Sequence, residues 1–190
     1  MYVLLIDIEL EDYETLIAAL NSQTQYILYT PSNDTYDSII TKIDNLVNKD
    51  QIISIALATH GVSPSSNFSL LSNESTSTLD NIEIADPTMT TWTDFIAFLN
   101  SIKTKLTNLQ HFDFLGCSLL SYGEWRYALN QLETITGINI RASDDDTGNL
   151  KEGGDWVLES DNVNVRNVYF TDTIEEYAYL LFGAGYHFEF

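Results

Sequence analysis

The chain has 190 residues, 44% of them hydrophobic, which is typical of one globular domain with a sizeable core. Its 8 Lys and Arg against 28 Asp and Glu give a formal charge of −20, which repels phosphate backbones and excludes nucleic acid as an expected partner. No apolar run is long enough for membrane insertion, and no basic leader precedes the first apolar run, so we expect a soluble chain without a signal peptide, cytoplasmic or particle-associated.

The first half of the chain alternates continuous apolar runs with amphipathic stretches. Apolar runs predict strands at 2–8, 25–29 and 52–59, and apolar residues at helical spacing predict helices at 13–20 and 36–47. Unbroken apolar strands are typical of parallel sheets that are covered on both faces.

The second half continues this alternation after a long polar loop that includes an expected hairpin at 68–71 and 82–84. A helix is predicted at 92–106, a strand at 111–116, a helix between Cys117 and Gly137, and a strand at 138–142. Connections that contain a helix join parallel strands through right-handed crossovers. We therefore expect an α/β three-layer sandwich with a mainly parallel central sheet flanked by helices, as in flavodoxin-like folds.

The C-terminal part differs in kind and predicts a β-rich tail. Short edge strands are expected at 155–160 and 162–170, a last helix at 174–181, and an added strand or arm at 186–190. We expect one domain over 1–183 and a C-terminal aromatic arm over 184–190.

Two residues with catalytic chemistry follow predicted neighbouring strands. His60 and Gly61 come after one strand, and Cys117, the only cysteine, comes after the next and begins a loop into a helix. Ligand sites of parallel sheets gather at these carboxyl ends, and a helix N-terminus lowers a thiol pKa. The sequence predicts Cys117 as nucleophile and His60 as base, with the N–H groups of Gly61 and Cys117 as an oxyanion hole for acyl transfer.

The order of these residues resembles caspase-like cysteine peptidases, in which His-Gly follows one strand and Cys the next. Fifty-seven positions separate His60 from Cys117, close to the roughly 50 of caspases, although LGCSLL lacks the caspase Gln-Ala-Cys-x-Gly signature. A closer resemblance is to an uncharacterised domain family near the start of large, acidic bacterial surface proteins, through LATHG, LGCS, ASDDDTG and GGDW in the same order. The resemblance implies the same fold and a peptide or protein substrate.

Asp144, Asp145 and Asp146 follow the fifth predicted strand and so belong to the same rim. In caspase-like peptidases an acidic residue here can select Arg or Lys beside the scissile bond, whereas the plain alternative is a solvated, Asx-rich turn. Calcium is not expected, because Gly148 is not sixth from Asp144 and no Glu is twelfth. No metal site and no cofactor are expected.

An alternative function needs no chemistry at this rim. A lone cysteine is commonly a small buried hydrophobe, His111 and His187 suit packing or surface roles, and Trp156 suits the core. The chain would then be a catalytically silent structural or interaction protein, for example a homo-oligomeric capsid subunit that contacts its neighbours through the aromatic arm.

Overall fold

The computed structural model describes residues 1–61 and 90–182 and contains one five-stranded parallel sheet. The strand order β2-β1-β3-β4-β5 is the order of flavodoxin-like sheets. The predicted α/β fold with a mainly parallel sheet is thereby confirmed. The strands are β1 (Tyr2–Asp7), β2 (Thr24–Tyr29), β3 (Ser54–Ala58), β4 (His111–Phe114) and β5 (Asn139–Ala142).

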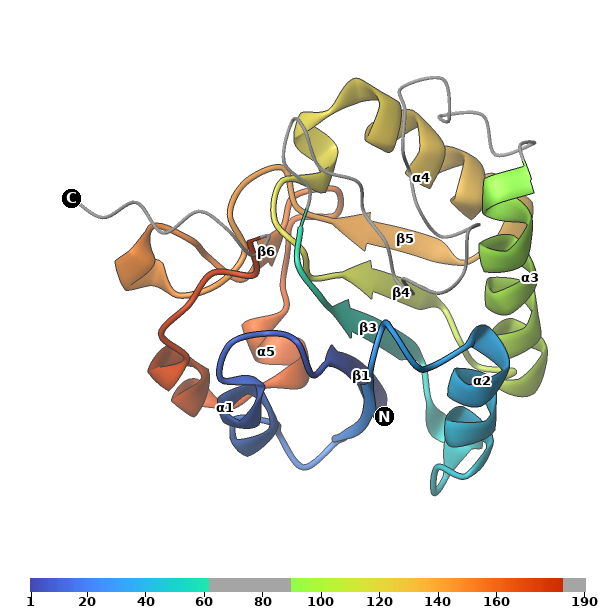
Figure 1. The fold of residues 1–190 in the computed structure, drawn as a ribbon, viewed down its shortest axis with the longest axis horizontal. Helices are drawn as coiled ribbons and strands as arrows, with labels where there is room; N and C mark the ends of the chain where they lie inside the picture. Colours follow the sequence, from blue (N-terminus) through green and yellow to red (C-terminus); the bar gives the residue numbers. More distant parts are fainter. Residues whose placement is uncertain (62–89, 183–190) are drawn as a thin grey trace.

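Helices cover both faces of the sheet and make it the middle of three layers. On one side lie α2 (Tyr36–Asp44), α3 (Thr90–Lys105) and α4 (Gly123–Thr136); on the other lie α1 (Tyr13–Ala18) and α5 (Arg166–Tyr169) (Figure 1). None of the helices in the described ranges combines the length and the apolarity needed to cross a bilayer.

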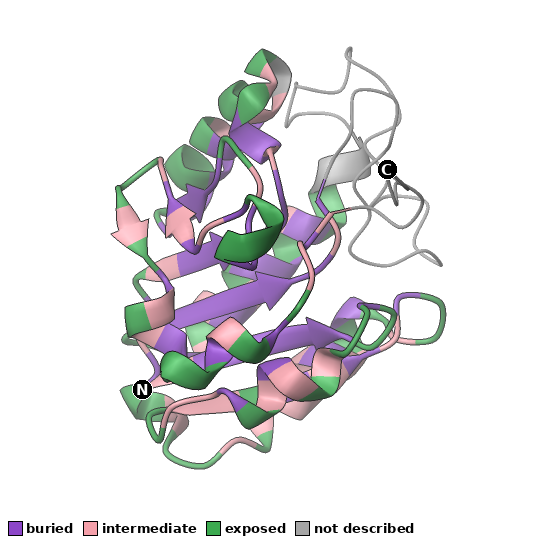
Figure 2. Ribbon diagram, turned by 90° about the vertical axis from the view of Figure 1, so that its left-hand side faces the viewer, coloured by how far each residue is buried: buried purple, intermediate pink, exposed green. Residues whose placement is uncertain are grey.

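The inner strands β1 and β3 send alternate side chains into two separate cores. In β1, Val3 and Leu5 join the core beneath α2, α3 and α4, whereas Leu4 and Ile6 join the core shared with α1 and α5. The inner strands β1 and β3 are buried almost throughout, in contrast to the edge strand β2 and to the helices, which have buried and exposed faces (Figure 2). This double burial explains the unbroken apolar runs in the sequence.

Local signals account for where several helices begin and end. Thr35 caps α2 with a reciprocal capping box, in which its side chain accepts from the Ser38 N–H and the Ser38 hydroxyl accepts from the Thr35 N–H. Gly137 ends α4 in the left-handed region at φ 62°, which glycine adopts without a side-chain penalty.

Two predicted helical segments differ in the structure. The helix expected directly after Cys117 is preceded by a 3₁₀ turn, Leu119–Ser121, and α4 begins only at Gly123. The helix expected at 174–181 is wrong: a 3₁₀ helix ends at Glu176, and the chain then runs extended because its backbone pairs with residues 147–149.

The predicted tail strands are present but very short. β6 (Val157–Leu158) and β7 (Val163–Asn164) form an antiparallel pair, and the rest of the predicted second strand is α5. The expected hairpin within the long loop and the expected arm at 184–190 lie outside the described residues.

A buried polar network lies on the face of the sheet that α5 covers. The Arg141 guanidinium donates to both carboxylate oxygens of Asp113 at 2.6 Å, and the Tyr169 hydroxyl donates to the same carboxylate at 2.5 Å. The Asp113 side chain is fully buried, and the Ser54 hydroxyl lies 2.6 Å from the Tyr169 hydroxyl. The network thereby ties α5 to β3, β4 and β5.

Candidate functional site

His60 and Gly61 lie beside Cys117 because β3 and β4 are adjacent parallel strands. The last registered pair, Leu57 with Phe114, is followed three residues later by His60 beyond the end of β3 and by Cys117 beyond the end of β4. A Cβ on Gly61 would lie 2.3 Å from the Cys117 nitrogen and oxygen, so only glycine allows this approach of the two backbones.

The two amides predicted as an oxyanion hole point to one oxygen. The Gly61 N–H donates to the Leu181 carbonyl oxygen at 2.8 Å, and the Cys117 N–H donates to the same oxygen at 3.2 Å. The two donors therefore converge on one position, which a peptide carbonyl of the chain itself occupies.

Leu181 belongs to an extended segment, residues 179–182, that we call the strap. It pairs antiparallel with residues 147–149: the Leu181 N–H donates to the Thr147 oxygen at 2.8 Å, and the Asn149 N–H donates to the Tyr179 oxygen at 3.1 Å. The strap is thus bound as an added strand across the ends of β3 and β4.

Two glycines of the sequence motifs make room for the strap. A Cβ on Gly148, whose φ is +144°, would lie 2.6 Å from the Tyr179 oxygen, and one on Gly154 would lie 2.5 Å from the Leu180 Cδ2 atom. Gly153 has a φ of +94° and open space around it, and so serves the turn alone. Residues of all four sequence motifs, LATHG, LGCS, ASDDDTG and GGDW, therefore bond to the strap or make room for it.

His60 is hydrogen-bonded to the strap and makes no hydrogen bond to Cys117 within the described part of the chain. Its Nδ1 lies 2.5 Å from the Phe182 carbonyl oxygen; because a carbonyl only accepts, Nδ1 carries the proton. In the neutral imidazole, Nε2 is then a proton acceptor, and it is buried with no partner among residues 1–61 and 90–182.

The Cys117 thiol differs from the sequence prediction. It is fully buried, donates to the Thr147 oxygen at 3.5 Å and accepts from the Thr147 N–H at 3.3 Å. Burial raises the thiol pKa to about 12, with nearby Asp146 and Asp145 also disfavouring the thiolate. The expectation of a lowered pKa is wrong because the sulfur lies within the α1/α5-side core and the next long helix begins six residues later.

The three aspartates contact the segment that follows Cys117, Asp144 and Asp145 through backbone oxygens and Asp146 through its carboxylate. The Ser118 N–H donates to the Asp145 oxygen at 2.7 Å, and the Asp145 carboxylate accepts from the Ser143 hydroxyl. Asp144 and Asp145 are exposed, and with Glu159 their carboxylate oxygens lie within 4.8 Å of one another, a spacing that suits a cation. Exposed acidic groups of this kind are common without an ion, so the spacing alone assigns no metal.

Asp7 is a carboxylate at this rim that sequence reasoning missed. It ends β1, is 3% exposed, and accepts from the Thr59 hydroxyl at 3.3 Å and from the Glu9 N–H at 2.8 Å. Burial raises the pKa of Asp7, and His60 is close enough to lower it in part. The sequence did carry a signal for Asp7, because it is the one charged residue near the end of an otherwise apolar predicted strand.

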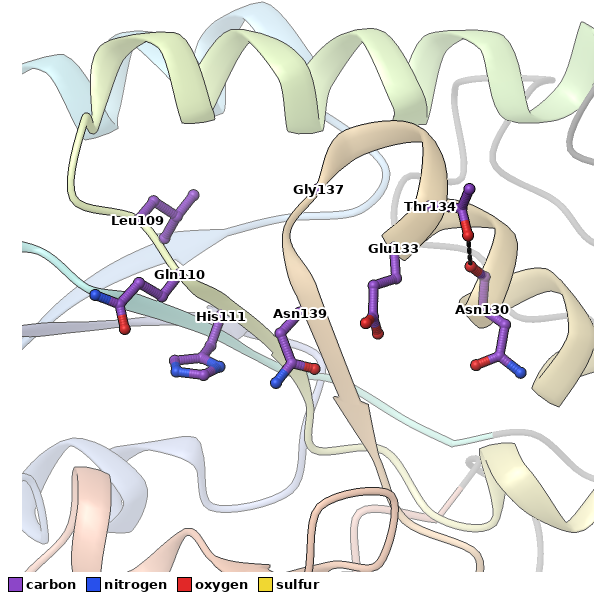
Figure 3. A pocket seen from close by; sticks show the side chains of 8 residues that line it. All are labelled: Leu109, Gln110, His111, Asn130, Glu133, Thr134, Gly137 and Asn139. Atoms are coloured by element: carbon purple, nitrogen blue, oxygen red, sulfur yellow. Dashed lines mark hydrogen bonds between the residues drawn. The ribbon is translucent and has the colours of Figure 1, made fainter.

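A groove lies at the opposite, amino-terminal edge of the sheet. It is lined by the start of β4, the end of α4 and the start of β5, with His111, Glu133 and Asn139 among its side chains (Figure 3). Burial lowers the pKa of His111. The groove shares no lining residue with the strap site.

A family model described as a domain of unknown function (DUF4347) matches residues 3–181. No curated protein and no solved structure matches the chain.

Proposed function

The chain belongs to this DUF4347 family, and we propose that its fold carries a caspase-like cysteine hydrolase site, closed to external peptides by the strap, in which His60 and Cys117 perform acyl transfer on a peptide. The convergence of the Gly61 and Cys117 amides on one peptide carbonyl oxygen carries the proposal. Paired backbone donors of this kind stabilise the oxyanion of a tetrahedral intermediate. The resemblance in residue order to caspase-like peptidases supports the same conclusion.

His60 supplies the proton acceptor that the reaction needs. With Nδ1–H donating to the strap, Nε2 is the basic nitrogen of the ring. The proposal requires the Cys117 side chain to turn from Thr147, its partner in the structure, toward the imidazole, so that the thiol proton passes to Nε2 and the thiolate attacks a carbonyl carbon. The strap must loosen for an external peptide to enter.

The aspartate contacts do not favour selection of Arg or Lys. Asp145 bonds to Ser143, Asp146 lies 3.5 Å from the Ser118 hydroxyl, and the residue whose carbonyl fills the site is Leu181. Selection of basic residues by Asp144, Asp145 and Asp146 therefore remains a prediction for the test below.

A catalytically silent structural or interaction protein is the second candidate. Two observations favour it: the thiol is buried with a pKa raised to about 12, and it bonds to Thr147 rather than to His60. In that case the strap is a permanent part of the fold, and contacts with assembly neighbours would use other surfaces.

The test opens the site and asks whether His60 activates the thiol. Gly148→Ala places a methyl group against Tyr179 and Leu180 and displaces the strap, while Gly153→Ala, also at positive φ but with free space, is the matched control. Each is treated with peptidyl acyl-ketone inhibitors bearing Leu or Arg beside the ketone, and intact mass reports modification of Cys117.

The hydrolase proposal expects Gly148→Ala to be modified at least about tenfold faster than Gly153→Ala, and the added change His60→Ala to abolish that gain. A preference for the Arg inhibitor that disappears in Asp145→Asn would support the acidic pocket. If iodoacetamide labels Cys117 in Gly148→Ala while both inhibitors leave it unmodified, the thiol is accessible but not catalytic. That outcome supports the catalytically silent structural or interaction protein.

A further inference from the structure

We propose that the substrate of this site is the chain's own Leu181–Phe182 peptide bond, which the domain cleaves in cis. The inference rests on the proposed hydrolase function and adds its substrate. It starts from the strap, whose backbone is held by hydrogen bonds at the Leu181 N–H, the Leu181 carbonyl oxygen and the Phe182 carbonyl oxygen.

The two sides of this peptide bond lie against different groups. On the acyl side, the Leu181 carbonyl oxygen accepts from the Gly61 and Cys117 amides. On the amine side, the Phe182 residue bonds to His60 through its carbonyl oxygen at 2.5 Å. Acyl transfer requires this division, because the oxyanion forms on the acyl carbonyl and the leaving amine takes a proton from the general acid.

The sulfur lies on the acyl side as well. The Thr147 oxygen accepts both from the Cys117 thiol, at 3.5 Å, and from the Leu181 N–H, at 2.8 Å. One acceptor atom is thus shared by the nucleophile and by the residue it attacks. For attack, the proposal requires the Cys117 side chain to turn from Thr147 toward the Leu181 carbonyl carbon while the strap stays in place.

The strap is also anchored on its N-terminal side, which fixes the register of the bond. Leu181 is fully buried, and the Asn149 side-chain amide donates to the Tyr177 oxygen at 2.5 Å. With Gly148 and Gly154 closely approaching Tyr179 and Leu180, a shift by one residue would lose these contacts and expose Leu181. Leu181 is therefore the only strap residue whose carbonyl fits between the two amides.

The reaction proceeds in two balanced steps. The Cys117 thiol gives its proton to His60, the sulfur bonds to the Leu181 carbonyl carbon, and the C–N bond to Phe182 breaks as His60 returns the proton to the Phe182 nitrogen. Water then attacks the thioester, giving a Leu181 carboxylate, the free thiol and one proton that is released to solvent. The part of the chain that begins with Phe182 leaves with a new amino terminus.

The experiment follows the intact mass of the full chain from about pH 8 to about pH 10, because burial raises the pKa of the Cys117 thiol and the thiolate fraction therefore grows as pH rises. The expected result is a product comprising residues 1–181 that accumulates in wild type and is absent in Cys117→Ala and in Leu181→Asp. Leu150→Asp is the matched control, because Leu150 is 69% exposed, and it is cleaved like wild type. Circular dichroism verifies that each variant is folded.

Hydroxylamine distinguishes the thioester route from an outside protease, since it diverts the acyl group to a Leu181 hydroxamate detectable by mass. A chain that stays full length while Cys117 is still modified by inhibitors in a His60-dependent way overturns self-cleavage and leaves the hydrolase function standing. A full-length chain without such modification overturns both.

Discussion

Gly61 shows how one missing side chain determines the geometry of the rim. Its Cα lies against the Cys117 backbone, and its N–H reaches the Leu181 carbonyl oxygen only because no Cβ separates the two loops. Gly61 has no positive φ that would by itself require glycine, so the constraint is one of space.

Gly61→Ala is expected to lower the free energy of unfolding by about 1–3 kcal/mol, because the added methyl meets backbone atoms that cannot rotate away. Gly123→Ala, with nothing within 4 Å of its Cβ, is the control and should cause no loss. Urea unfolding measures both. Equal midpoints for the two variants would show that the approach of Gly61 to Cys117 is not constrained.

The Cys117 thiol gives a second test, in its pH dependence. With its pKa raised to about 12, native-state alkylation is expected to be slow at neutral pH and to rise about tenfold per pH unit, without a plateau near the ordinary thiol pKa. Because the folded-state pKa lies above the unfolded one, the thiol's contribution to stability is complete at neutral pH and is lost as pH rises toward 12. Iodoacetamide kinetics by mass spectrometry measure this, and a plateau near pH 9 contradicts the burial.

Between elements, the buried network of Asp113, Arg141 and Tyr169 joins α5 to the sheet and so stabilises the support on which the strap rests. Its charges are compensated by a two-pronged ion pair and by the Tyr169 hydroxyl. Such pairs need not exceed apolar packing in net stability, but breaking one leaves a buried charge without a partner.

Asp113→Ala is therefore expected to cost about 3–5 kcal/mol of unfolding free energy, since Arg141 loses its only carboxylate among the described residues. Asp44→Ala, which removes half-exposed ion pairs to Lys49 and Lys105, should cost far less. Denaturant unfolding of both variants is the measurement. Similar losses would mean that the network is not a buried charge pair in solution.

Across the whole molecule, the formal charge of −20 acts on stability rather than on the choice of fold. With 28 acidic side chains against 8 basic ones, the compact state carries a self-repulsion that salt screens. The described ion pairs are few and mostly half-exposed.

Raising sodium chloride from low ionic strength to about 0.15 M is expected to raise the urea midpoint through this screening. Glu11→Lys, an exposed charge reversal, should stabilise by about 0.5 kcal/mol at low salt, and the gain should shrink as salt is added. A gain independent of salt would show that local contacts at residue 11, not net charge, cause it.

The sequence by itself determined the parallel sheet, its strand limits to within a few residues, and the meeting of His60, Gly61 and Cys117 at one rim. It did so because continuous apolar runs and helical spacing report local periodicity, and adjacent strand ends follow from it. Tertiary structure alone decided that residues 177–182 are extended, although their apolar pattern also suits a helix, since pairing with residues 147–149 satisfies their backbone. It also decided the state of the thiol: pKa depends on burial and on partners distant in sequence, here Thr147 and the strap, which no local pattern specifies.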